Sequence, residues 1–64
     1  MTKITFERYD AIRGCTVLTV EDEQGNILGW IHRTGNSHYR HPIKGLYSDT
    51  TRYTSEEAAL AAFG

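Results

Sequence analysis

Aromatic and basic side chains are interleaved along residues 30–53, and this segment is the part of the chain best suited to contact nucleic acid. Aromatic rings stack on bases, and cationic side chains hold phosphates. The candidates for these contacts are Trp30, His32, Arg33, Tyr39, Arg40 and Lys44. The formal net charge of −1 argues against strong binding, because phosphate contacts dominate affinity for nucleic acid. The same residue types are also common on the solvent face of an ordinary sheet.

Acidic side chains form a second candidate surface, and its densest group is Glu21, Asp22 and Glu23 at an expected hairpin tip. Negative charge of this kind can steer a protein toward a nucleic-acid-binding partner and occupy that partner's phosphate track. The candidate partner-binding residues are Glu7, Asp10, Glu21, Asp22, Glu23, Asp49, Glu56 and Glu57. For any one of these acids, solubility is the simpler role.

Three histidines, His32, His38 and His41, raise the question of a metal site, because neutral imidazole is a good zinc ligand. Their spacing matches no common zinc pattern, so we predict no metal and no other cofactor. Catalysis would need a nucleophile and base, or paired carboxylates, gathered in a pocket. A chain of 64 residues without such a cluster is not expected to be an enzyme.

The elements that must position these side chains are short strands separated by turns. Alternation and β-branched residues predict strands over residues 2–9, 12–20, 27–33 and 38–41, with a further edge strand over residues 43–47. Gly25 supplies the positive φ of a tight hairpin loop, and Pro42 disfavours a long central strand at that point. Val17 and Val20 fall on opposite faces of the second strand, which predicts cover on both sides or a bulge near Gly14.

A helix is predicted at the carboxyl end of the chain. Thr54 and Glu57 have the spacing of a capping box, in which each side chain satisfies the other residue's backbone N–H. Glu56 and Glu57 lie in the first turn, where the helix dipole favours negative charge, and Gly64 marks the stop.

These elements predict an α+β fold in which residues 1–64 form a single domain. An antiparallel sheet of three to five strands carries one C-terminal helix packed on one face. The expected core is Ile4, Phe6, Cys15, Val17, Leu18, Val20, Ile27, Ile31, Ala59, Leu60 and Phe63. Trp30 is either a large core residue or a half-exposed platform.

Size and composition limit the setting in which the chain works. A domain of this length buries only about 60 % of its unfolded surface, so its stability is expected to be modest. Cys15 is the only cysteine, which suits a reducing compartment, and no secretory signal or membrane span is visible. We therefore expect a cytoplasmic protein, either monomeric or weakly dimeric through an exposed edge strand.

The junction Tyr53-Thr54-Ser55-Glu56-Glu57-Ala58-Ala59, following short strands that carry a tryptophan, resembles a known class of DNA-binding domain. These three-stranded-sheet domains occur in plant ethylene-response factors and at the N-termini of phage integrases. The resemblance implies a sheet laid in the major groove, with Trp30, His32, Arg33, Tyr39 and Arg40 as candidate readers. The chain departs from this class in its acidic net charge and in lacking an arginine-rich sheet and an attached catalytic domain.

In its small size, its single expected domain and its acidic character the whole chain resembles the small stand-alone proteins of phages and mobile elements, among them anti-CRISPR proteins. That resemblance implies a non-enzymatic inhibitor in the host cytoplasm. Such an inhibitor binds a host nucleic-acid-binding protein, for example a CRISPR effector subunit, and blocks its access to DNA. It would place Glu21, Asp22 and Glu23 at the contact surface. The sequence therefore favours an acidic inhibitor, with a DNA-binding sheet around Trp30 and Arg40 as the alternative.

Overall fold

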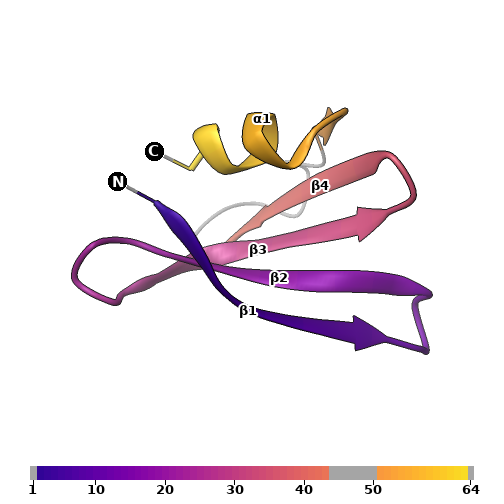
Figure 1. Ribbon diagram of the computed structural model, residues 1–64, viewed down its shortest axis with the longest axis horizontal. Helices are drawn as coiled ribbons and strands as arrows, with labels where there is room; N and C mark the ends of the chain where they lie inside the picture. Colours follow the sequence, from indigo (N-terminus) through magenta and orange to yellow (C-terminus); the bar gives the residue numbers. More distant parts are fainter. Residues whose placement is uncertain (1, 44–50, 64) are drawn as a thin grey trace.

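The computed structural model describes residues 2–43 and 51–63, and within them the α+β fold is confirmed. Five antiparallel strands form one sheet in the order β1-β2-β3-β4-β5, and a single short helix follows (Figure 1). The elements are β1 Lys3–Asp10, β2 Cys15–Glu21, β3 Ile27–Thr34, β4 Ser37–Pro42, β5 Arg52–Tyr53 and α1 Glu56–Ala61. The predicted edge strand over residues 43–47 lies, apart from Ile43, outside the described residues.

The turn between β1 and β2 is longer than the sequence predicted. Asp10 accepts hydrogen bonds at Oδ1 from the backbone N–H groups of Ile12 and Arg13, and its carbonyl accepts one from Gly14 at 2.8 Å. Gly14 has a φ of 68°, which glycine adopts without steric cost. The second strand therefore begins at Cys15, and Ile12 lies exposed in the turn.

A β-bulge in β1 overturns one core prediction. Ile4 pairs with Val20 and Phe6 pairs with Thr19, so Thr5 is an extra residue in the strand. Because a bulge reverses the side-chain alternation beyond it, Phe6 points to the face opposite Ile4. Phe6 is 60 % exposed and does not belong to the core.

The buried cluster is formed by Leu18, Val20, Ile31 and Ala59, each with no exposed surface. We call the side of the sheet that carries Leu18, Val20 and Ile31 the core face. The partly buried residues packed against the cluster are Ile4, Leu28, Tyr53, Leu60 and Phe63. Cys15 and Val17 are also buried, although they point to the opposite face. The second strand, β2, is therefore covered on both sides, which is one of the two alternatives that the sequence predicted for it.

Ile27 was predicted in the core and is instead 43 % exposed. It is the first residue of β3, directly after the hairpin turn, where it pairs with Glu21. A register shift beside this pair adds Leu28 to the strand, and Leu28 packs against the buried cluster. The predicted positive φ at Gly25 in the same hairpin is confirmed at 84°.

The helix begins one residue later than the predicted capping box requires. Ser55, and not Thr54, is the N-cap, and its Oγ accepts a hydrogen bond from the backbone N–H of Ala58 at 3.1 Å. The third helical position is therefore Ala58, so Glu57 does not close a capping box. Glu56 and Glu57 still lie in the first turn. Gly64, which the sequence predicts to end the helix, lies outside the described residues.

Gly29 lets β3 approach β4 and the end of the chain closely. Its φ of 153° is rarely adopted by residues with a side chain. A Cβ atom at this position would lie 2.7 Å from Phe63 Cε1 and 2.8 Å from Pro42 Cα, and it would also meet the His41 carbonyl oxygen. The absence of a side chain at Gly29 therefore makes room for the Phe63 ring.

Gly29→Ala should destabilise the protein by about 3 kcal/mol, because it combines overpacking with backbone strain. Urea unfolding followed by circular dichroism measures this loss. Gly35→Ala is the matched control, since Gly35 has a φ of 58° but nothing within 4 Å of the added atom. It should lose only about 1 kcal/mol from backbone strain. Equal losses in the two variants would contradict the close packing at Gly29.

Candidate functional site

The face of the sheet opposite the core face gathers aromatic side chains from three strands. Side chains alternate along a strand, so Trp30 and His32 share one side of β3 while Ile31 occupies the other. Trp30 pairs with His41, and His32 pairs with Tyr39, which places the β4 aromatics on the same side. Phe6 reaches this side across Thr19, which also pairs with Trp30. We call this surface the Trp30 face and define it by Phe6, Trp30, His32, Tyr39 and His41.

Ring geometry supports the assignment of this face independently of the register. The rings of His32 and His41 have centroids 3.9 Å apart and an interplanar angle of 32°. Both histidines are half-buried, as are Trp30 and Tyr39, whereas Phe6 is largely exposed. The face is therefore an aromatic surface that is partly exposed to solvent.

Guanidinium groups lie at the margins of the Trp30 face. Arg8 pairs with Val17 at the β1 edge, and Arg52 pairs with Tyr39 at the β5 edge, so both side chains point to this side. Arg13, in the β1–β2 turn, is close enough to both ring histidines to lower their pKa values. Asp10 forms an ion pair with Arg13 at 3.7 Å. Within residues 2–43 and 51–63, Arg8, Arg13 and Asp10 thus give the β1 edge of the face a formal charge of +1, and Arg52 gives the β5 edge +1.

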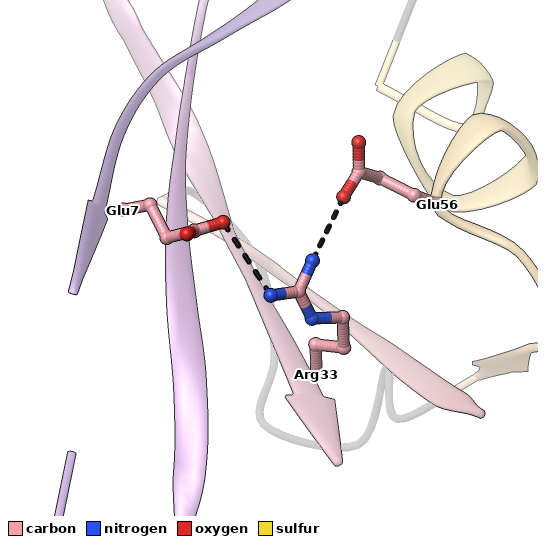
Figure 2. Close-up of polar contacts among 3 residues, drawn as sticks. All are labelled: Glu7, Arg33 and Glu56. Atoms are coloured by element: carbon pink, nitrogen blue, oxygen red, sulfur yellow. Dashed lines mark hydrogen bonds and ion pairs between the residues drawn. The ribbon is translucent and has the colours of Figure 1, made fainter. Parts of the chain in front are cut away.

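Arg33 lies on the core face and makes structural contacts there. Its Nη1 is 3.2 Å from Glu56 Oε1 on α1, and its Nη2 is 3.4 Å from Glu7 Oε1 on β1 (Figure 2). One guanidinium thus joins β1, β3 and α1. The sequence grouped Arg33 with Trp30 and His32, and the structure places it on the other side of the sheet.

Arg40 also belongs to the core face. It pairs with Ile31, and its guanidinium carbon lies 5.5 Å from the centroid of the Phe63 ring, within range of a cation–π contact. The predicted nucleic-acid set is therefore divided: Trp30, His32 and Tyr39 share one face, while Arg33 and Arg40 share the other. Lys44 lies outside the described residues.

The predicted acidic surface is distributed over separate places. Glu7 and Glu56 flank Arg33, and Asp10 supports the first turn. Glu21 lies at the other end of β2 from Cys15, the partner of Asp10, so about 20 Å separate these two acids along the strand. Asp49 lies outside the described residues, and Glu57 is exposed on α1.

The hairpin tip keeps three of the predicted acids together, and the contacts of Asp22 and Glu21 tie it to neighbouring residues. Asp22 Oδ1 accepts hydrogen bonds from the backbone N–H groups of Gln24 and Asn26, each at 2.9 Å. The bond from the Asn26 backbone is the main cause that lowers the pKa of Asp22. Glu21 Oε2 accepts a hydrogen bond from the Thr5 hydroxyl at 2.6 Å.

Sequence reasoning missed Phe6, Arg8 and Arg13 as parts of the site. A period of two along β3 and β4 was visible in the sequence and would have separated Trp30 from Arg33. The presence of Phe6 and Arg8 from β1 on this face depends on the bulge at Thr5, and no residue type in that strand predicts a bulge. Arg13 reaches the face through the length of a turn, and the sequence did not specify that length.

Metal ligation finds no support among the described residues, where no three His, Cys, Asp or Glu side chains are grouped to hold an ion. His38 pairs with Arg33 and is buried on the core face, away from His32 and His41.

The described part of the chain also contains no helix long and apolar enough to span a membrane.

Comparison with known proteins returned no match to the chain among protein-family models, curated proteins or solved structures.

The two ring histidines have lowered pKa values. Burial is the main cause for His32, with positive charge at His41 and Arg13 adding to it, while Asp10 acts in the opposite direction. Burial is again the main cause for His41, followed by Arg13. At neutral pH both rings are therefore uncharged, and protonation would bring two cations close to each other.

Stability should fall as the pH is lowered below about 6.5, the ordinary histidine value. The unfolded chain then binds protons that the folded chain resists, so unfolding becomes easier until the folded pKa values are reached. Above about pH 7 these two groups contribute no pH dependence, because both states are deprotonated. Urea unfolding at several pH values between about 5 and about 8, where histidine titrates, measures how steeply the free energy of unfolding changes with pH. His32→Gln/His41→Gln should flatten this slope, and an unchanged slope in this variant would contradict the assignment.

Proposed function

We propose that the protein binds DNA through the Trp30 face, without catalysing a reaction. The observation that carries this proposal is the placement of aromatic rings in the middle of the face, with guanidinium groups around them. Rings offer stacking surfaces to bases, and guanidinium groups pair with phosphates. The resemblance to three-stranded-sheet DNA-binding domains implies the same use of a sheet.

The acidic net charge does not oppose binding at this face, because most of the acids lie elsewhere. Glu7 and Glu56 are on the side of the sheet that carries Arg33, and their charge is shared with its guanidinium. Fields of exposed charges are screened within about 10 Å at 0.1 M salt. Each edge of the face, with a local charge of +1, can therefore attract phosphates although the whole chain carries −1.

The proposal also takes α1 to pack on the core face and so to leave the Trp30 face uncovered. Supporting this arrangement, Ala59 is buried in the same cluster as Leu18 and Ile31. Thr2 Oγ1 lies 3.3 Å from the Leu60 carbonyl oxygen, to which it donates, and this contact joins the start of the chain to α1. The space beside Gly29 is occupied by the Phe63 ring.

Arg8→Gln/Arg52→Gln should weaken binding by about tenfold or more at low salt, because it removes two phosphate contacts from the edges of the face. It should also reduce the slope of log K against log salt by about 1.4 to 1.8. Fluorescence anisotropy with a labelled oligonucleotide measures both effects. The titration is repeated at several salt concentrations between about 20 and about 200 mM, a range over which phosphate contacts weaken strongly.

Arg33→Gln is the matched control, since it removes a guanidinium from the opposite face. It should leave DNA affinity within about twofold, although it loses the ion pairs with Glu7 and Glu56. If neither single-stranded nor duplex DNA binds the unaltered protein at low salt, the proposed function is wrong.

A second candidate function follows from the acidic hairpin tip. Glu21, Asp22 and Glu23 are consecutive at the β2–β3 turn, and the lowered pKa of Asp22 favours the charged form of that carboxyl group. We propose as the alternative an inhibitor of the anti-CRISPR kind. It would act in the cytoplasm of a host cell and present this tip to a nucleic-acid-binding protein, for example a CRISPR effector subunit. The charge would occupy the track that phosphates normally fill.

Neutralising the tip tests this alternative without breaking the turn. Asp22→Asn keeps the oxygen that accepts from the backbone N–H groups of Gln24 and Asn26, and the Asn26 side-chain amide, which donates to Asp22 Oδ2, can rotate to accept instead. The variant Glu21→Gln/Asp22→Asn/Glu23→Gln should therefore stay folded. Capture of a purified CRISPR effector subunit should fall at least about tenfold, because three steering charges are lost. Unchanged capture by a variant with an unaltered circular dichroism spectrum would exclude the tip as the contact surface.

A further inference from the structure

We infer that the Trp30 face binds single-stranded DNA with its bases unstacked, in preference to duplex DNA. This inference rests on the proposed function and specifies its substrate. It follows from what the middle of the face offers and from the spacing of its rings.

The middle of the Trp30 face offers aromatic surfaces for stacking, and not the paired hydrogen-bonding groups that read base edges. The bidentate contacts that discriminate base pairs in the major groove of a duplex come from Arg, Lys, Asn or Gln side chains placed at base edges. In the row that crosses β1 to β4, the face presents Phe6, Thr19, Trp30 and His41. None of these four side chains carries a guanidinium, ammonium or amide group. The row is therefore suited to the flat surfaces of bases.

The spacing of the rings requires bases that have left their stack. Phe6 and Trp30 lie two strands apart, which places their Cα atoms about 9.5 Å from each other. Successive nucleotides along one strand of a duplex are about 3.4 Å apart. A duplex cannot present base faces to both rings, because its bases already stack on each other. A flexible single strand can turn one base onto each ring.

The cations at the margins complete the site for a single strand. Arg8 and Arg52 are both exposed and occupy the two edges of the second row, which crosses Val17, His32 and Tyr39. Arg52 is held by a hydrogen bond from its Nε to Ser37 Oγ at 2.9 Å. Charge at both edges can contact phosphates while the bases between them rest on aromatic rings.

Anisotropy with three labelled 12-mers tests the inference: a mixed-sequence single strand, an abasic single strand of about the same phosphate charge, and the duplex, which carries about twice that charge. The base-bearing single strand should bind about tenfold or more tightly than the other two. Its binding should also quench the fluorescence of Trp30, the only tryptophan.

Phe6→Ala should weaken binding of the base-bearing strand by about tenfold, because one stacking surface is lost. Tyr9→Ala is the matched control, since Tyr9 is 67 % exposed but pairs with Thr16 on the other side of the sheet. It should leave the affinity unchanged. Both aromatic residues are exposed, so neither change is expected to prevent folding.

The outcomes separate this inference from the function on which it rests. If the duplex binds as tightly as the single strand, or the abasic strand binds as tightly as the base-bearing one, stacking on unpaired bases is overturned while DNA binding stands. A single-stranded RNA of the same sequence and length is measured alongside, and tighter binding of this RNA would overturn the assignment to DNA. Failure of all the oligonucleotides to bind at low salt would overturn the proposed function itself.

Discussion

The alternation of side chains along β2 and β3 is the constraint on which the rest of the structure depends. Because neighbours in a strand point to opposite faces, Leu18 and Ile31 can enter the buried cluster only while Val17 and Trp30 point away from it. The core therefore fixes which residues are available for binding. A slip of one residue in this pairing would expose the cluster and bury the polar side chains, so the register is strongly specified.

The bulge at Thr5 allows one edge strand to serve both faces. Before the bulge, Ile4 packs against the buried cluster, and after it Phe6 joins the opposite side. The same shift turns Glu7 toward Arg33, which in turn contacts Glu56. An exposed ion pair is worth little by itself, about 0 to 1 kcal/mol. These ion pairs matter instead for where the charges lie, because they keep the Arg33 guanidinium and the carboxylates of Glu7 and Glu56 on the side of the core face.

The sequence predicted the elements well where local chemistry decides them and poorly where a single extra residue changes the geometry. The strands around Val17 and Ile31, the glycine at position 25 and the C-terminal helix follow from alternation, turn chemistry and first-turn acids. The exposure of Phe6 depends on a bulge, which rearranges a strand without changing its composition. The helix cap was misplaced because Thr54 and Ser55 both carry a hydroxyl, and only backbone geometry selects Ser55.

The site was predicted in part, because charge that is grouped in the sequence is not grouped in space. Arg33 and Arg40 belong to the basic segment, yet the sheet directs both to the core face. Arg8 and Arg13 come from residues 1–28, where five acidic side chains outnumber three basic ones, yet they lie at the margin of the Trp30 face. A period of two, applied from Trp30, separates the first pair from the aromatic residues. The second pair can be assigned only after β1 is placed in register with β2, so the binding face is a property of the pairing and not of any one segment.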